Sequence, residues 1–301
     1  MIISRTPFRI SFFGGGTDYP VWYREQGGSV ISVSINKYCL ITLRALPPFF
    51  DYNYRIRCYL REETKTIDEI AHPSVRECLR FMQVDRGVEV VHSADLPARS
   101  GLGSSSSFTV GLLNALYAFM GKMPTKRELA LNAIHVEQEQ IKENVGSQDQ
   151  TAAAFGGLNR IDFGGPQHIL VRPIILHKDR IDQLCSHLML FFTGFSRTAS
   201  HIAAEQIKET LEKSRELKKM MALVEEAMSI LLNGERSLDD FGRLLHDQWL
   251  IKRDITGLIS NQKINDIYSA ALRSGALGGK LLGAGGGGFI LFFVRPEDQQ
   301  T

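Results

Sequence analysis

The stretch PARSGLGSSSSFTVGLL, residues 97–113, constrains the fold most, because it joins a glycine-rich loop to an apolar helix. Four consecutive serines are poor residues for a helix interior, since each hydroxyl competes for backbone hydrogen bonds. The residues that follow nevertheless have the apolar spacing of a buried helix, at Phe108, Val110, Leu112, Leu113, Leu116 and Phe119. The chain therefore starts a core helix with small polar residues, and this start needs a physical reason.

A phosphate-binding helix terminus would supply that reason. The first turn of a helix leaves N–H groups without intrahelical partners and carries partial positive charge, which suits phosphate. Gly101 and Gly103 would let the loop fold around the anion, and Ser104–Ser107 could donate to its oxygens or bind Mg²⁺. The alternative is a helix that the serines merely cap, and this stretch alone does not decide between the two.

Two further glycine clusters lie near the chain ends, FFGGGTDYP at 12–20 and GGKLLGAGGGGFILFF at 278–293. Neither they nor the central cluster contains the G-x-x-x-x-G-K-[ST] of a P-loop. GAGGGG fits G-x-G-x-x-G but precedes an expected strand, and no acidic residue can follow it by about 20 positions, so a dinucleotide fingerprint is excluded. Each cluster is an expected turn or a place where backbone meets a ligand closely.

The segment HVEQEQIKENVGSQDQTAAAFGG, residues 135–157, concentrates carboxylates. Glu139 and Glu143 on a helical segment are ordinary candidates for solvated surface. Asp149 lies between two glutamines and beside a run of alanines, where a charged group held close to packed backbone needs a partner.

Strand and helix patterns alternate, and both halves are mixed, which predicts an α+β fold with two domains, 1–180 and 181–301. FRISFF alternates as a half-buried strand whose polar face carries Arg9 and Ser11. SVISVSINKYCLITL is interpreted as two strands with a bend near Asn36. We expect other strands in YRIRCYL, GVEVVHS, GLNRIDF, QHILVRPIIL, HLMLFFTG and GFILFFV, and helices after Gly103 and over 126–141, 200–232, 237–251 and 263–274.

Composition narrows the function classes. The 301 residues are 44% hydrophobic and 23% charged with a formal charge of +2, which favours a globular protein and argues against a nucleic-acid partner. No apolar stretch approaches a membrane span, and the N-terminus lacks the features of a signal peptide. The four scattered cysteines favour reduced thiols in a core. We expect a cytoplasmic protein that binds neither nucleic acid nor membrane.

The three glycine clusters together resemble those of the GHMP small-molecule kinases, such as galactokinase, homoserine kinase and mevalonate kinase. LPARSGLGSSSS is similar to the family's central phosphate loop, KLLGAGGGG to its C-terminal glycine motif, and TPFRISFFGGGTDYP to the N-terminal motif of its sugar kinases. Gly15 and Gly16 replace the Glu-His of galactokinases, and R-I-S-F-x-G-G-G-T-D looks like the heptose 7-phosphate kinase branch, with L-fucose kinases as near neighbours. The resemblance implies a ribosomal protein S5 domain 2-like N-terminal domain and a ferredoxin-like C-terminal domain.

The resemblance also implies roles for particular residues. Asp149 would accept the proton of the substrate hydroxyl, with Arg9 beside it as a second catalytic residue that favours the carboxylate form. Ser105, or alternatively Ser104, and Glu137 would hold Mg²⁺. ATP would be bound by Arg99, Ser100, Gly101, Leu102, Gly103, Ser104, Ser105 and Ser106. The sugar would be bound by Ser11, Gly14, Gly15, Gly16, Thr17, Asp18, Arg197, Gly286 and Gly287.

Arg99 departs from the family pattern, which has a small residue there, and it could contact a phosphate or point to solvent. A substrate phosphate would need cations, and the sequence offers Arg24, Arg160, Arg197 and Lys280 without ranking them. The expected activity is ATP-dependent phosphorylation of the anomeric hydroxyl of D-glycero-D-manno-heptose 7-phosphate. The alternatives are a kinase for L-fucose, galactose or mevalonate, or a non-catalytic sugar sensor on the same fold. Whether the chain is a homodimer stays open.

Overall fold

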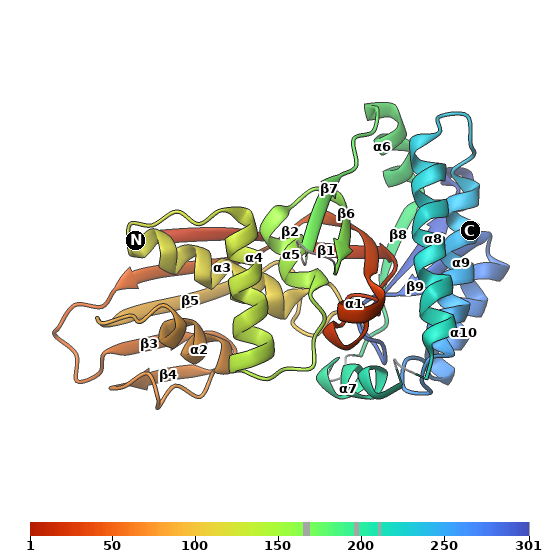
Figure 1. Ribbon diagram of the computed structural model, residues 1–301. Coiled ribbons are helices and arrows are strands. Elements are labelled where there is room, and N and C mark those ends of the chain that lie inside the picture. Colours follow the sequence, from red (N-terminus) through yellow and green to blue (C-terminus); the bar gives the residue numbers. More distant parts are fainter. Residues whose placement is uncertain (165–168, 196–198, 210–211, 301) are drawn as a thin grey trace. The chain divides into compact units, whose positions relative to one another are not determined.

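The structure is a computed structural model that describes all residues except 165–168, 196–198, 210–211 and 301 (Figure 1). Two compact units alternate along the chain. Unit 1 consists of residues 1–9, 34–98 and 103–156, and unit 2 consists of residues 10–33, 99–102 and 157–301. This grouping by contacts is discontinuous, whereas the sequence-based division at residue 180 is continuous and stays a prediction.

Two long strands, β1 (Ile2–Phe13) and β2 (Gly28–Ala45), pair with each other and contribute residues to both units. In unit 1 the second half of β2 pairs antiparallel with β5. Strand β3 then lies parallel to β5 and antiparallel to β4. The bounds of these three strands are Tyr54–Arg57 for β3, Arg61–Thr64 for β4 and Val88–Ala94 for β5.

The helices of unit 1 pack on one another. They are α2 (Pro73–Phe81), α3 (Ser104–Phe119), α4 (Lys126–His135), the π-helical turn η1 (Val136–Gln140) and α5 (Gln148–Phe155). A capping box at Thr125 and Glu128 starts α4, and the helix expected over 126–141 is present with its last turn widened to η1. Five of the six apolar positions expected on α3 are buried, and Phe119 is half-buried.

Unit 2 contains two sets of antiparallel strands. The first half of β2 pairs with β6 (Leu158–Phe163), which pairs with β7 (Ile169–Pro173). A second sheet has the order β8 (Leu188–Phe192), β10 (Phe289–Val294) and β9 (Ala276–Leu281). The helices are α1 (Pro20–Gln26), α6 (Lys178–Ser186), α7 (Ala199–Glu209), α8 (Ser214–Leu232), α9 (Asp239–Arg253), α10 (Gln262–Arg273) and the 3₁₀ turn η2 (Pro296–Asp298).

Helix α8 runs beside α9 in unit 2 (Figure 1). The apolar spacing of the sequence predicts a core face through Leu217, Met221, Val224, Met228 and Leu231. Leu217, Val224 and Leu231 are buried, whereas Met221 and Met228 are half-buried and Met220, Ala227 and Ile230 are buried as well. The sequence NGE at 233–235 predicts a helix stop, and α8 ends at Leu232.

The fold is α+β as predicted, but two expectations about local structure are wrong. The stretch around Asn36 is not a bend between two strands: β2 is continuous and changes its pairing partner from β6 to β5 along its length. The cysteines are all free, yet Cys185 is exposed rather than part of a core. The sequence GGP at 164–166, which predicts a turn between β6 and β7, falls mainly outside the described residues.

Candidate active site

An ion pair joins the two residues that the sequence singles out for catalysis. Arg9, near the middle of β1, donates from Nε to Oδ1 of Asp149 over 2.8 Å and from Nη2 to Oδ2 over 2.7 Å. The arginine side chain is 5% exposed and the aspartate side chain 30%, so the pair is anchored on one side and open on the other. Such a two-pronged contact fixes both the position and the orientation of the carboxylate.

Asp149 lies in the first turn of the short helix α5, which positions its carboxylate. β1 presents Arg9 to that turn. The expectation that FRISFF is half-buried is wrong, because all six of its residues are buried and Arg9 lies on a face that the protein covers. The structure therefore brings together two residues that are 140 positions apart in the chain.

Glu137 lies in the π-helical turn η1 and is fully buried. Its Oε2 accepts hydrogen bonds from Ser106 Oγ, at 2.8 Å, and from the side-chain amide of Gln150. Its Oε1 is buried with no hydrogen-bond partner among the described residues. Burial raises the pKa of Glu137 to about 7, against the opposing effect of the side chains of Thr109, Gln150 and Ser106.

The first turn of α3 contains the serines that opened the sequence analysis. The N-cap residue is Gly103, with a left-handed φ of 75°, so the alternative of a serine N-cap is wrong. Having no side chain, Gly103 cannot bond the N–H groups of the first turn as a serine or aspartate would. A Cβ at Gly103 would lie 3.2 Å from Cγ of Arg9 and 3.5 Å from Oδ2 of Asp149, so this backbone adjoins the ion pair.

The serines of this turn face different ways. Ser106 bonds Glu137, Ser107 donates to the carbonyl oxygen of Pro7 over 3.0 Å, and Ser104 is half-buried. Ser105 is exposed. The predicted pair of Mg²⁺ ligands was Ser105 and Glu137, whereas the serine that the structure places against Glu137 is Ser106.

Glu137 has the chemistry of a metal ligand. A buried carboxylate with one oxygen unpartnered gains a partner from a cation, and Mg²⁺ commonly takes one or two protein carboxylates together with phosphates and waters. Among the residues that the structure describes, no three His, Cys, Asp or Glu side chains gather as a complete metal site. The residues present thus fit a Mg²⁺ ion that arrives with nucleotide phosphates better than one held by protein alone.

The preceding part of the loop, Arg99–Leu102, belongs to unit 2 and packs against the C-terminal glycine motif. The carbonyl oxygen of Ser100 accepts from the N–H of Phe289 over 3.0 Å, and a Cβ at Gly101 would lie 2.5 Å from the carbonyl oxygen of Leu282. Leu102 and Ser100 are fully buried, and no hydrogen-bond partner of Ser100 Oγ lies among the described residues. Arg99 is exposed and has a positive φ of 59°, which is rare for a residue other than glycine.

The N-terminal glycine motif forms a tight turn in unit 2. A Cβ at Gly14 would lie 1.8 Å from the carbonyl oxygen of Ser29, so glycine is required there by the protein's own packing. Thr17 is fully buried and donates to the carbonyl oxygen of Gly14 over 2.8 Å, while Asp18 Oδ1 accepts from the N–H of Gly16 over 2.9 Å. In this structure both side chains hold the turn together, and direct contact of either with a substrate stays a prediction.

The remaining predicted substrate residues each make different local contacts. Ser11 is buried and its hydroxyl would lie 3.6 Å from a Cβ at Gly15. The N–H of Gly286 donates to the carbonyl oxygen of Ile259 over 2.9 Å, and a Cβ at Gly287 would lie 2.9 Å from the Phe195 ring. Arg197 lies outside the described residues.

The sequence did not predict that Ser106 and Gln150 are hydrogen-bond partners of the Glu137 carboxylate. Gln150 is fully buried, and the signal for it was its place directly after Asp149 in the pattern G-x-x-D-Q. A helix face that carries Asp149 outward turns the next residue inward, toward Glu137.

Comparison with known proteins identifies the family. The N-terminal domain of GHMP kinases matches residues 68–157, and the C-terminal domain of GHMP kinases matches residues 203–301. The chain belongs to the GHMP kinases. It is therefore an ATP-dependent phosphotransferase, as the three glycine motifs predicted.

The curated relatives include the D-glycero-alpha-D-manno-heptose 7-phosphate kinase of Campylobacter jejuni, 30% identical over 98% of this chain and 90% of that protein. The L-fucokinase/L-fucose-1-P guanylyltransferase of Bacteroides fragilis is 26% identical over 99% of this chain but only 35% of its own length. Among solved structures, a D-glycero-D-manno-heptose 1-phosphate kinase from Bacteriodes thetaiotaomicron has a TM-score of 0.72 at 23% identity, covering 100% of this chain and 90% of that one. A galactokinase of Lactococcus lactis has a TM-score of 0.75 at 18% identity, covering 99% and 87%.

These structural similarities support the GHMP kinase fold. Because the sequence identities are low, the similarities do not assign a substrate. Within the described residues, no helix has both the length and the apolar character needed to cross a membrane.

Proposed function

We propose that this kinase transfers the γ-phosphoryl group of ATP to the anomeric hydroxyl of D-glycero-D-manno-heptose 7-phosphate and yields the 1,7-bisphosphate. The observation that carries the proposal is the 30% identity to a heptose 7-phosphate kinase along nearly the whole of both chains. The ion pair of Arg9 with Asp149, beside the backbone of Gly103, supplies the chemistry that such a transfer needs.

Asp149 accepts the proton of the attacking hydroxyl in this proposal. Its carboxylate is partly open to solvent, and both of its oxygens are oriented by Arg9. A positioned general base contributes about 10²–10⁴-fold to the rate. Arg9 holds that base in place and adds positive charge where the transferred group becomes more negative.

Glu137 and a serine of the first turn of α3 would hold Mg²⁺ in this proposal. When bound, the ion neutralises charge on the β- and γ-phosphates of ATP. Ser106 already orients the Glu137 carboxylate, and the exposed Ser105 lies on the same turn. The backbone from Ser100 to Gly103 would surround the triphosphate, since the first turn of α3 has no side-chain cap.

Ser11, the turn Gly14–Asp18 and the backbone at Gly286 and Gly287 would shape the sugar pocket. In the structure their own hydrogen bonds hold the turn and the glycine motif in defined conformations. A preorganised backbone loses little entropy when sugar hydroxyls bind to it. Arg197 keeps its place among the proposed substrate contacts from the sequence alone.

Release of ADP across a panel of acceptors tests the proposal. The panel consists of heptose 7-phosphate, the same heptose without phosphate, L-fucose, galactose and mevalonate. We expect the highest kcat/KM with heptose 7-phosphate, and NMR of the product should place the new phosphate at the anomeric carbon. Efficient turnover of L-fucose or galactose without turnover of the phosphorylated heptose would refute the assignment. No release of ADP with any acceptor would favour the non-catalytic sensor.

A further inference from the structure

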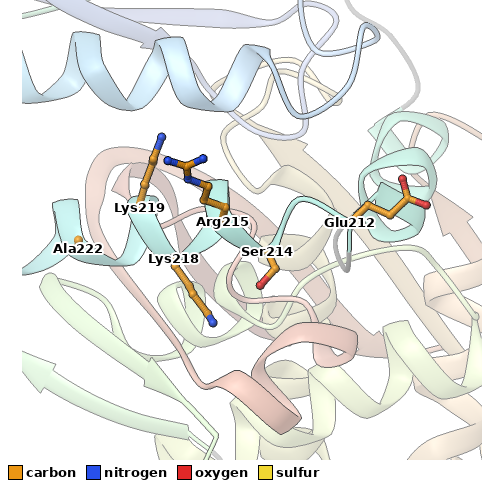
Figure 2. Close-up of a pocket in the computed structure, with 6 residues that line it drawn as sticks. All are labelled: Glu212, Ser214, Arg215, Lys218, Lys219 and Ala222. Carbon is orange, nitrogen blue, oxygen red and sulfur yellow. The ribbon is translucent and has the colours of Figure 1, made fainter.

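An open hollow of about 720 Å³ lies at the start of α8 in unit 2, and cationic side chains dominate its lining. Figure 2 shows these residues: Lys218 points to the same side of the helix as Ser214, while Arg215 and Lys219 point to the other. Arg215, Lys218 and Lys219 are all exposed, and Glu212 is the one carboxylate that lines the hollow with them. Within the described residues none of the three cations makes an ion pair. The hollow therefore carries positive charge that the protein does not neutralise.

Helix α8 packs directly on the turn of the N-terminal glycine motif. A Cβ at Gly16 would lie 3.3 Å from Cδ2 of Leu217, and a Cβ at Gly14 would lie 2.9 Å from Cγ2 of Val224. Lys218 follows Leu217 on the same helix, about 100° further round its axis. The cations of the hollow thus lie on the helix that packs on the turn assigned to the sugar by the proposed function.

Two of the cations that the sequence offered for a substrate phosphate have other partners. Arg160 donates to both carboxylate oxygens of Glu225, over 2.8 and 2.6 Å, and to Asp162 over 2.9 Å. Lys280 is 1% exposed and donates to the carbonyl oxygen of Phe12 over 2.8 Å. Neither side chain can reach a ligand without breaking these contacts, whereas Lys218 needs to break none.

We propose that Lys218 binds the phosphate group that the acceptor sugar carries at the end opposite its reacting hydroxyl. This inference rests on the proposed function, because it requires a phosphorylated acceptor. A lysine supplies a compact positive charge that pairs with a phosphate dianion. The hollow then sets specificity: it favours sugar phosphates over free sugars without touching the phosphoryl group that is transferred.

Steady-state kinetics of Lys218→Ala with heptose 7-phosphate and with the same heptose lacking phosphate tests this role. We expect the KM for the phosphorylated sugar to rise about 10-fold to 100-fold, as the loss of a hydrogen bond to a charged group predicts. The kcat at saturation and the kcat/KM for the free heptose should stay within a factor of about two. Lys218→Arg should restore most of the affinity.

Arg273→Ala is the matched control, because Arg273 is an exposed cation on another helix of the same unit and makes no ion pair within the described residues. It should leave both KM values unchanged. If the wild type uses heptose 7-phosphate and Lys218→Ala does not alter its KM, the inference fails and the proposed function stands. If the wild type uses only unphosphorylated acceptors, both fail together.

Discussion

The buried carboxyl of Glu137 makes a prediction about stability that needs no substrate. Its pKa is raised from 4.5 to about 7, chiefly because burial disfavours the charged form. Below pH 4.5 the group is protonated in both the folded and the unfolded chain and contributes nothing. Between these values the unfolded chain releases the proton while the folded chain retains it, so stability falls as pH rises.

The size of this effect follows from the shift. At 1.36 kcal/mol per pKa unit, ionising Glu137 in the folded state lowers the free energy of unfolding by about 3 kcal/mol in total. Most of this loss, about 2.5 kcal/mol, falls between pH 5 and pH 8. The neutral variant Glu137→Gln keeps an oxygen that can accept from Ser106 and Gln150, and it has no charge to desolvate.

Urea unfolding at pH 5, 6, 7 and 8, without nucleotide or metal, measures the effect. Between pH 5 and pH 8 the wild type should lose about 2.5 kcal/mol more than Glu137→Gln, because all other titrating groups are shared by the two proteins. Glu139→Gln is the matched control, since Glu139 lies in the same turn but is exposed, and it should follow the wild type. Equal pH dependence in Glu137→Gln and the wild type would refute the reasoning. Comparing slopes also removes any constant cost of the new amide group.

Two further variants test the catalytic assignment. Asp149→Asn should retain ATP binding in calorimetry and lower kcat at least about 10²-fold, since an amide cannot take the proton; near-normal turnover would end its role as base. Ser106→Ala should raise the Mg²⁺ concentration needed for half-maximal rate, because it frees the carboxylate of Glu137 from the hydrogen bond that orients it. Comparison with Ser105→Ala then shows which serine matters: if only Ser105→Ala changes the Mg²⁺ dependence, the exposed serine is the ligand, as the family resemblance implied.

The sequence predicted well those elements whose signal is local. The apolar spacing after Gly103 placed α3, and the alternation of FRISFF predicted the strand β1, although not that its polar residues are buried. Strand β2 was divided wrongly because Ser34 and Asn36 have the composition of a bend. Their backbone instead belongs to a strand that changes partner from β6 to β5. Pairing between distant segments overrides local preference, and the sequence contains no direct record of it.

The residues of the candidate site could be predicted from the sequence, but the contacts between them could not. The order of the motifs identified Arg9, Glu137 and Asp149, and two of these form the ion pair. Which serine faces Glu137 depends on the helical phase of α3, and each residue turns by about 100°. An error of one residue in the start of the helix therefore exchanges Ser105 for Ser106, and element ends are the least certain part of a sequence-based assignment.

Glycine clusters are ambiguous for a related reason. A glycine permits close approach to its backbone, but the sequence does not say whether a ligand or another part of the chain makes that approach. At Gly14 and Gly101 the neighbour is the protein's own carbonyl oxygen, which a Cβ would approach to 1.8 and 2.5 Å. At Gly103 a Cβ would instead face the Arg9–Asp149 pair, at a tight 3.2 Å from Cγ of Arg9 and an ordinary 3.5 Å from Oδ2 of Asp149. Catalytic significance is therefore argued for Gly103 from the charged side chains beside it, and the other two positions need no ligand to explain them.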